Sequence, residues 1–398
     1  MVFSSLTFLF LFLPVTLLLY YIRKDIVWKN IILLIMSLIF YAWGEPVYVV
    51  LMIISIIFNY FIGKDIESSD RPKHVLVMGI IVNLMILGYF KYSGMLVDTI
   101  NTITGLSIRN RQLALPIGIS FYTFQAMSYI IDVYRGKCSA QQKIVPFAVY
   151  ITMFPQLIAG PIVQYQDIED QLNVRRFSGK DFSDGVFIFV KGLARKVIFA
   201  NCIGALHTQI LALGTLPVVT AWIGAIAYTL QIFNDFSGYS DMAIGLGKML
   251  GFNFPLNFDR PYASLSVTEF WRRWHISLGT WFREYVYIPL GGNRKGAARQ
   301  ILNLAIVWAL TGLWHGAAWN FVIWGVYYGI LLILEKFIFN RFKEKWPKAV
   351  NWLITFIIVV IGWVFFFSDS LSSAMTYLGY MFGKGRSFAN GLSGFYIL

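Results

Sequence analysis

The chain has 398 residues, of which 58% are hydrophobic and only 13% are charged. Soluble globular domains contain roughly 25% charged residues, so this composition excludes an ordinary water-soluble protein. A membrane-spanning helix needs about 20 apolar residues, and the length therefore allows about ten of them joined by short loops. We predict an all-α, polytopic integral membrane protein that forms one membrane domain over residues 1–398.

The formal net charge is +13. In a soluble protein such a charge would suggest nucleic-acid binding, but here lysines and arginines cluster between apolar runs, where they orient a protein against the cytoplasm. We interpret the charge as topological, predict no nucleic-acid partner and keep anion binding as a weaker alternative. Cys138 and Cys202 lie far apart and form no Cys-x-x-Cys or Cys/His cluster, so neither a disulfide framework nor a metal site is predicted.

The first apolar segment, residues 5–22, has no positive charge before it and is followed by Arg23, Lys24 and Lys29. A cleaved signal peptide shows the opposite order, with the charge first. We therefore expect a retained first helix whose N-terminus lies outside, with the 23–30 loop in the cytoplasm.

The first half of the chain continues with apolar segments that predict helices. A turn is expected at Gly44-Glu45-Pro46, because proline removes a backbone donor. Residues 144–163 contain three prolines, so this segment is too irregular for a straight span and is expected to line a cavity or re-enter the membrane. The predicted helices cover residues 31–43, 46–63, 75–90, 92–104 and 115–136.

In the second half, the polar stretch Gln164 to Asp184 predicts an exposed loop, and the basic residues of 185–203 suit an interfacial helix. Residues 217–250 are apolar at both ends but contain Asn234, Asp235 and Asp241. Two interpretations stay open for these three: a loop or helix break at the membrane surface, or a wall of a reactive cavity. Two more spans are predicted over 317–334 and 350–367.

Two of the four histidines, His275 and His315, lie among tryptophans in apolar surroundings. An ionisable side chain at membrane depth costs several kcal/mol unless it faces a protein-lined or water-filled cavity. These two imidazoles are therefore our first candidates for a functional site. His207 stands alone and His74 lies in a charged loop, so we expect a structural and a surface role for them.

A helical wheel of residues 267–285 places most aromatic side chains, Trp274 included, on one face and His275 on the other. We predict one continuous amphipathic helix that borders a wet tunnel or lies at the interface. Arginines that cluster beside such a histidine suit a phosphate-bearing ligand. The alternative is that they bind lipid headgroups or only set the topology. The candidate ligand-binding cations, which would bind the donor under the resemblance given below, are Arg272, Arg283, Arg294 and Lys295.

His315 has small or apolar neighbours, and Gly312 and Gly316 allow another backbone to approach closely. A helix there is expected to hold the imidazole deep in the protein, where burial favours its neutral form. A neutral imidazole is the general base that acyl transfer needs. The alternative is a hydrogen-bonded core histidine. Trp314 and Trp319, which flank His315 in the sequence, join the candidate cavity-lining residues.

The longest motifs resemble the membrane-bound O-acyltransferase family, in particular the bacterial branch with the alginate O-acetylation protein and the D-alanyl transferase of teichoic acid synthesis. This resemblance implies a ring of about eleven helices around a funnel or tunnel, with His315 at the catalytic centre and His275 near it. Its motifs are LPIGISFYTFQAMSYIIDVYRG, FPQLIAGPIVQY, QIFNDFSGYSDMAIGLGKMLGFNFPLNFDRPY, FWRRWHISLGTWFREYVYIPLGGNR and LTGLWHGAAWNFVIWG.

The resemblance also implies a reaction. An acyl group, in the first place acetyl, would pass from a thioester donor (acetyl-CoA or an acyl-carrier protein) to a hydroxyl of an envelope or secreted polysaccharide. The transfer would be direct or through a separate extracytoplasmic acetyltransferase, in the bacterial inner membrane and without a bound cofactor. Resembling proteins usually continue past the apolar stretch that holds Leu398, so we expect a short or truncated member.

Two other classes of function stay open. The first is a transporter or export channel without acyl-transfer chemistry, although the chain lacks the paired broken segments in two halves that transporters commonly show. The second is an acyltransferase that acts on lipid or protein, which the branch resemblance makes the weaker alternative.

Overall fold

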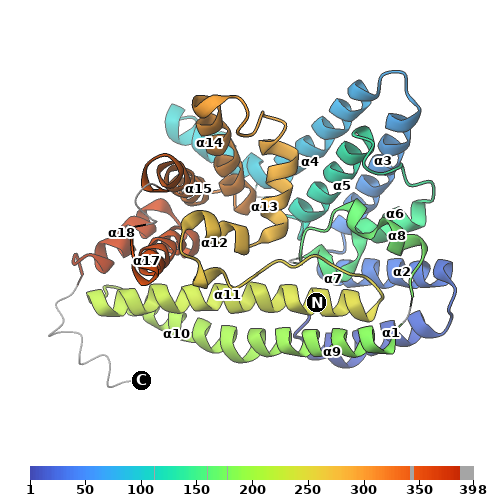
Figure 1. Ribbon diagram of the computed structural model, residues 1–398, viewed down its shortest axis with the longest axis horizontal. Helices are drawn as coiled ribbons and strands as arrows, with labels where there is room; N and C mark the ends of the chain where they lie inside the picture. The colour runs from blue at the N-terminus through green and yellow to red at the C-terminus, as the bar shows by residue number, and fades with distance from the viewer. Residues whose placement is uncertain (112, 159, 177, 341–344, 386–398) are drawn as a thin grey trace. The chain divides into compact units, whose positions relative to one another are not determined.

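The computed structural model describes residues 1–111, 113–158, 160–176, 178–340 and 345–385 (Figure 1). Over these residues the chain is helical, and the extended backbone contributes a single isolated bridge, between Phe258 and Trp274. The predicted all-α class is confirmed. Contacts within the chain group it into an N-terminal unit, residues 1–193 and 239–256, and a C-terminal unit, residues 194–238 and the described residues from 257 on.

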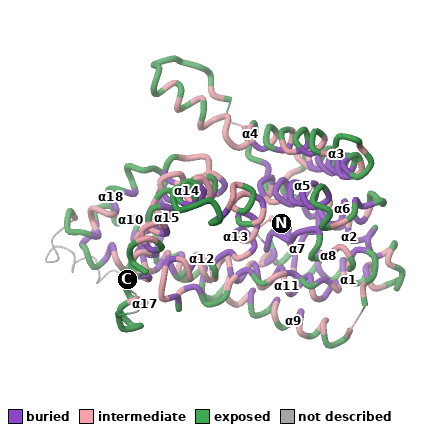
Figure 2. Tube along the Cα trace, turned by 45° about the horizontal axis from the view of Figure 1, so that its top comes forward, coloured by how far each residue is buried: buried purple, intermediate pink, exposed green. Residues whose placement is uncertain are grey.

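The N-terminal unit is organised around α5, which is buried along most of its length (Figure 2). Helices α3 and α4 pack on α5, and Gly63 of α3 allows a close approach because a Cβ there would lie 2.4 Å from the Tyr129 hydroxyl. The helices of this unit are η1 (Phe8–Phe12), α1 (Leu13–Tyr21), α2 (Ile26–Gly44), α3 (Tyr48–Ser68), α4 (Pro72–Thr104), α5 (Ile119–Tyr134), α6 (Ile144–Thr152), α7 (Phe154–Leu157), α8 (Tyr165–Asn173) and α9 (Gly179–Ala194).

The prediction of two separate helices over 75–90 and 92–104 is wrong, because α4 runs through without a break. Lys91, the residue between the two predicted segments, lies inside α4 and donates from Nζ to the Ser120 hydroxyl of α5 over 3.0 Å. The helix ends at Gly105, whose φ of +71° is a left-handed conformation that glycine adopts without strain.

The prediction of an exposed loop over Gln164 to Asp184 is also wrong. Helix α8 starts with a capping box, in which Gln164 and Asp167 each bond the backbone N–H of the other. Tyr165, Ile168 and Leu172 recur at helical spacing and are buried, so the segment has an apolar face despite its polar composition. The irregular backbone expected over 144–163 is confirmed, since α6 ends at Thr152 and the four-residue α7 follows.

The C-terminal unit holds the helices that carry both histidine motifs. They are η2 (Arg195–Ala200), α10 (Asn201–Ala212), η3 (Pro261–Ala263), α12 (Val267–Arg273), α13 (Ile276–Phe282), η4 (Arg283–Tyr287), α14 (Gly296–His315), α15 (Trp319–Leu334), η5 (Glu335–Phe339), α17 (Lys348–Phe367) and α18 (Leu371–Met381). Helix α11 (Val218–Met249) begins in this unit, and its last residues belong to the N-terminal unit.

The interpretation of residues 217–250 as a loop or helix break is wrong, because α11 is one continuous helix. Two of its polar side chains have partners along the helix surface. Asn234 Nδ2 donates to the Leu230 carbonyl over 2.8 Å, and Asp235 forms a 2.7 Å ion pair with Lys196 of η2, which runs beside this part of α11 (Figure 1). The polarity therefore marks a helix–helix contact, where polar side chains hydrogen-bond between or within helices.

Six of the described helical segments are long and apolar enough to cross a membrane. Several candidate spans agree with the predicted polytopic membrane protein. A shorter apolar helix, Phe8–Tyr21, lies within the predicted first segment, residues 5–22. The six are Ile26–Gly44, Tyr48–Ser68, Pro72–Thr104, Gly296–His315, Trp319–Phe339 and Lys348–Phe367.

Helices α14 and α15 form a hairpin whose backbones touch at glycine. A Cβ on Gly312 would lie 2.4 Å from the Phe321 carbonyl oxygen, and one on Gly325 would lie 2.3 Å from the Trp308 carbonyl oxygen. Backbone atoms cannot rotate away as a side chain can, so neither position has room for a side chain. The close approach expected at Gly312 is confirmed, and the hairpin holds the His315 motif against α15.

We predict that Gly325→Val destabilises the folded chain by about 1–3 kcal/mol or more, the usual cost of overpacking. Thermal unfolding of the detergent-purified protein measures the effect. Gly88→Val is the matched control, because Gly88 is also helical and has no neighbouring atom within 4 Å of its added Cβ. Equal melting temperatures for the two variants would contradict the backbone contact.

Candidate active site

The chain breaks its helix at His275. The prediction of one continuous helix over 267–285 is wrong: α12 ends at Arg273, Trp274 is extended, and His275 has a φ of +46°. A β-bridge-like contact causes the break, since Asp259 N–H donates to the Arg273 carbonyl and Ile276 N–H donates to the Asn257 carbonyl. Left-handed backbone is costly for a residue other than glycine and is concentrated at functional sites.

His275 is 2% exposed and is held by a polar contact and aromatic rings. Its Nδ1 lies 3.1 Å from the Asn257 side-chain oxygen. The same oxygen accepts from the backbone N–H and the hydroxyl of Ser277, over 3.3 and 2.9 Å, so it is the acceptor and the Nδ1 of His275 is the donor. The ring of Phe236 packs edge-on at 4.7 Å.

This arrangement selects one tautomer of His275. With the proton on Nδ1, the lone pair of the neutral imidazole is on Nε2. Nε2 is buried and has no hydrogen-bond partner in the described part of the chain. The imidazole is therefore set to accept a hydrogen bond from a group that reaches it.

His275 lines a cavity of about 190 Å³ within the C-terminal unit. A second unsatisfied group belongs to the same wall, since Trp271 Nε1, a donor, has no partner within the described ranges. Most other lining residues are apolar or aromatic. The lining consists of Trp271, Trp274, His275, Leu278, Gly279, Phe282, Arg283, Tyr287, Leu304, Val307, Trp308 and Thr311.

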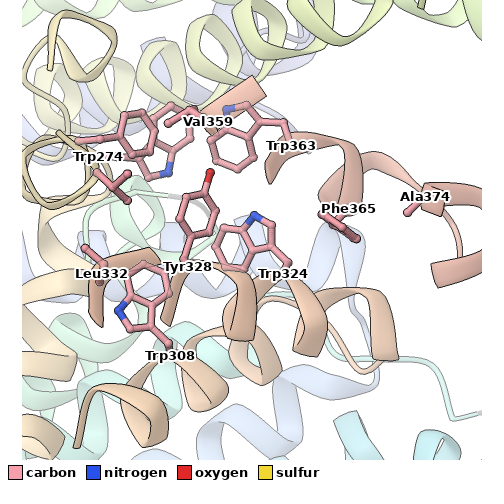
Figure 3. Close-up of a cluster of buried hydrophobic side chains, with 11 residues drawn as sticks. Trp274, Trp308, Trp324, Tyr328, Leu332, Val359, Trp363, Phe365 and Ala374 are labelled. Carbon is pink, nitrogen blue, oxygen red and sulfur yellow. The ribbon is translucent and has the colours of Figure 1, made fainter. Parts of the chain in front are cut away.

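A cluster of indole and phenol rings fixes one side of this wall (Figure 3). Trp271 packs on Trp308 at 4.8 Å and on Tyr328 at 4.8 Å, and Trp274 packs on Trp363 at 4.9 Å. Trp271, Trp308, Tyr328 and Trp363 come from α12, α14, α15 and α17, and Trp274 is the extended residue after α12. Aromatic pairs in such edge-to-face and tilted geometries add about 0.5–1.5 kcal/mol each to their burial, so the wall is rigid.

The structure places His315 differently from the expectation. It is the last residue of α14 and is partly exposed, so the prediction that it is the deeply buried imidazole is wrong. Its ring packs against Trp324 at 5.0 Å and Phe366 at 5.2 Å. Trp314 links the two histidines, because its indole lies 5.0 Å from the His315 ring and 5.9 Å from the His275 ring.

The candidate cations lie on the exposed surface of the same unit. Arg283 lines the cavity and pairs with Glu284 over 2.9 Å. Arg272, Arg294 and Lys295 are exposed and are not part of the cavity wall as the described residues define it.

The other candidate lining residues do not gather at this cavity. Asn234 and Asp235 make the contacts along α11 given above, and Asp241 belongs to the N-terminal unit. Trp319, at the start of α15, is 53% exposed. Trp274 does line the cavity, and the indole of Trp314 packs against the rings of His275 and His315.

Sequence reasoning missed Asn257 and singled out neither Trp271 nor Thr311. The available signal for Asn257 was a lone amide between Leu256 and Phe258 in a motif already used for the resemblance. His207 is buried and bonds the Gly224 carbonyl, as expected of a structural histidine. His74 is exposed as expected, but it lies in the first turn of α4 and not in a loop.

Comparison with known proteins decides the family. The sequence model described as MBOAT, membrane-bound O-acyltransferase family, matches residues 139–378, which include both histidines. This chain belongs to the membrane-bound O-acyltransferase family. The resemblance drawn from the motifs is confirmed, and the chain is an O-acyltransferase.

Relatives of this O-acyltransferase are bacterial proteins. Probable alginate O-acetylase AlgI of Pseudomonas aeruginosa is 45% identical over 393 residues, which cover 97% of this chain and 75% of that protein. The peptidoglycan O-acetyltransferase of Helicobacter pylori is 35% identical and covers 99% of this chain and 81% of its own length. The teichoic acid D-alanyltransferase of Bacillus subtilis is 28% identical over 60% of this chain and 62% of its own length.

The buried His275 gives this O-acyltransferase a pH-dependent stability. Burial lowers the pKa of His275 from 6.5 to about 3. Between these values the unfolded chain binds a proton that the folded chain does not. The contribution of the neutral His275 to the free energy of unfolding is therefore complete above pH 6.5 and is lost as the pH falls toward 3.

We predict that His275→Gln flattens the fall in melting temperature with acidification. His74→Gln, on the surface, is the control and should parallel the wild type; a His275→Gln curve that also does so would contradict this assignment.

Proposed function

We propose that this O-acyltransferase moves an acyl group, in the first place acetyl, from a thioester donor such as acetyl-CoA across the bacterial inner membrane to a hydroxyl of an envelope or secreted polysaccharide. The transfer is direct or passes through an extracytoplasmic acetyltransferase. The named activities of the relatives on alginate, peptidoglycan and teichoic acid support this class of acceptor. The proposal includes about ten or eleven helices around a central funnel.

The observation that carries the proposal is that two polar atoms without hydrogen-bond partners lie in the wall of the apolar cavity. His275 Nε2 is an unsatisfied acceptor and Trp271 Nε1 is an unsatisfied donor, and both residues line the same 190 Å³ space. An unpaired buried polar group costs about 1–3 kcal/mol, and a bound substrate offsets this cost by pairing it. A hydroxyl or amide N–H suits Nε2, and a carbonyl oxygen suits the indole N–H.

The chemistry follows from the two imidazoles. His315, the proposed general base, takes the proton of the attacking hydroxyl as its oxygen bonds to the thioester carbonyl carbon. The tetrahedral intermediate then loses the thiolate as the carbon–sulfur bond breaks, and the imidazolium returns the proton to sulfur. His275 accepts a hydrogen bond at Nε2 and orients the reacting group. The partial exposure of His315 supports this division, because its proton can exchange with water.

The apolar wall and the surface cations support the same reaction. Leu278, Phe282 and Leu304 keep the cavity poor in water, which favours transfer to a hydroxyl over hydrolysis of the thioester. Arg283 lies at this cavity, and the exposed Arg272, Arg294 and Lys295 are proposed to bind the phosphates of the donor, since guanidinium groups bind phosphate in a fixed fork.

We predict that His315→Ala lowers polysaccharide acetylation in cells by about 10²- to 10⁴-fold, the usual contribution of general-base catalysis. His275→Ala should lower it by about tenfold or more, since it removes one buried hydrogen bond. The measurement is the acetyl content of the isolated polymer, with membrane levels of each variant confirmed. His74→Ala, an exposed histidine, is the matched control.

The outcomes separate the roles and the rival function. If His315→Ala still acetylates while His275→Ala does not, the base is His275 and the division of roles is wrong. If the variants instead block export of a solute that is never acylated, and no acyl transfer is detected, the chain functions as a transporter.

Asn257 is a positioning residue in this scheme. We predict that Asn257→Ala lowers transfer by about tenfold, because it leaves the Nδ1 proton of His275 unpaired and frees the ring to change tautomer. Asn257→Asp keeps the acceptor and adds a negative charge, which raises the pKa of His275, so the acid limb of the pH–rate profile should move to higher pH. Ser277→Ala removes another donor to the same oxygen without touching the ring and is the control. An unmoved pH profile in Asn257→Asp would contradict the contact.

A further inference from the structure

The N-terminal unit holds a buried lysine and a half-buried arginine around one tyrosine ring, far in sequence from the histidine motifs. Lys29, near the start of α2, is 7% exposed, and its Nζ lies over the rings of Tyr20 and Tyr21 at 5.1 and 5.4 Å. The guanidinium of Arg175, from the segment between α8 and α9, lies over Phe252 at 4.5 Å and over Tyr20 at 5.7 Å. Both positive charges therefore lie within 6 Å of the centre of the Tyr20 ring.

Hydrogen bonding leaves most of Arg175 unsatisfied. Its Nη2 donates to the Asn30 side-chain oxygen, but Nε and Nη1 are buried and have no acceptor among the described residues. The hydroxyls of Tyr20 and Tyr21 donate to the carbonyls of Leu250 and Met249, at the end of α11. The aromatic rings stabilise the cations by less than the removal of a charge from water costs.

The nearby carboxylates do not neutralise this pair. Asp181 and Asp184 both pair with Lys248, at 3.6 and 3.2 Å. In the described ranges neither Lys29 nor Arg175 forms an ion pair. Burial lowers the pKa of Arg175, yet a guanidinium stays charged at any physiological pH, so a counter-charge is required.

Lys29 and Arg175 both line one small pocket. Its volume of about 10 Å³ admits a group the size of a water molecule or one oxygen atom. Four of its lining side chains are basic (Lys29, Arg175, Arg176 and Lys248) and one, Asp181, is acidic. The Ser178 side chain adds a neutral hydroxyl to the wall.

We propose that this pocket binds a phosphate group, with one phosphate oxygen inserted between Lys29 and Arg175. The pocket is too small for a whole phosphate, so the remainder of the ligand lies at the surface, beside Arg176. Phosphate suits the site because its oxygens accept charge-assisted hydrogen bonds from ammonium and guanidinium groups at once.

Two sources of phosphate fit this chemistry. Helix α2 is a candidate membrane span that begins at Ile26, so Lys29 lies in its first turn, at the depth where lipid headgroups meet a protein. Arg23 and Lys24 precede it and are exposed. An anionic phospholipid is one source, and a soluble phosphate compound is the other.

The test measures ligand-dependent melting of the full chain, purified in detergent. Phosphatidylglycerol, diacylglycerol without a phosphate, and inorganic phosphate are titrated separately. We expect phosphatidylglycerol to raise the melting temperature in a saturable way and diacylglycerol to leave it unchanged. Saturable stabilisation by inorganic phosphate as well would assign a soluble ligand. No stabilisation by either phosphate source overturns the proposal.

Variants tie the response to the two cations. Lys29→Met should weaken half-saturation by about tenfold or more, because one charge-assisted hydrogen bond is lost. Without ligand its melting temperature should not fall, since replacing a buried charge by an apolar side chain of similar size relieves desolvation. Lys24→Met, in the exposed segment just before α2, removes the same charge and should respond as the wild type does.

A second pair of variants keeps the test decisive. Lys29→Arg retains the charge and should retain the response. Arg175→Gln should lose it, and if that variant does not fold, the Lys29→Met and Lys24→Met titrations decide alone. An unchanged response in Lys29→Met overturns the site even if phospholipid stabilises the protein, because the lipid would then bind elsewhere.

Discussion

The hydrogen bond from His275 Nδ1 to the Asn257 side-chain oxygen determines what the cavity can do. The Asn257 oxygen accepts hydrogen bonds from three donors and cannot itself donate one. Nδ1 of His275 must therefore carry the proton, and the lone pair stays on Nε2. Full burial keeps this ring neutral. A neutral acceptor at a fixed position inside an apolar wall is useful for binding a hydroxyl or an amide, and it requires no counter-charge.

The helix break at His275 makes this bond possible. In a continuous helix, the side chains of Trp274 and His275 would project from one axis, about 100° apart. With Trp274 extended and His275 left-handed, the indole of Trp274 packs on Trp363 while the imidazole reaches Asn257 and Phe236. The strain of the backbone is offset by the burial of these rings and by the bonds that residues 257–259 make across the break.

The sequence locates α2, α3, α15 and α17 because each is a local run of about 20 apolar residues. It fails where a distant partner decides. Lys91 stays within α4 because Ser120 of α5 accepts from it, and the polar residues of α11 stay helical because Lys196 meets Asp235. No proline or glycine stands at His275 to predict the helix break. The break comes from contacts with residues 257–259, which lie 16 to 18 residues earlier in the chain.

The candidate site divides in the same way. Two imidazoles among tryptophans are chemically conspicuous in any apolar chain, so sequence alone selects them. Their burial, however, depends on tertiary contacts, and the structure exchanges the expected order: His275 is enclosed, whereas His315 ends its helix with partial exposure. Asn257 escapes detection because an amide carries no titratable signal.

Imidazole and guanidinium groups solve the problem of burial in opposite ways. His275 can release its proton, so enclosure lowers its pKa to about 3 and leaves an uncharged ring that packs among aromatics at modest cost. Arg175 cannot, because its guanidinium holds its proton even when burial lowers the pKa. Rings of Tyr20 and Phe252 spread over its faces but leave the Nε and Nη1 hydrogens unpaired. Arg175 stays charged beside a second cation, Lys29, so this pair requires an anion. The neutral imidazole of His275 requires only a hydrogen-bond donor.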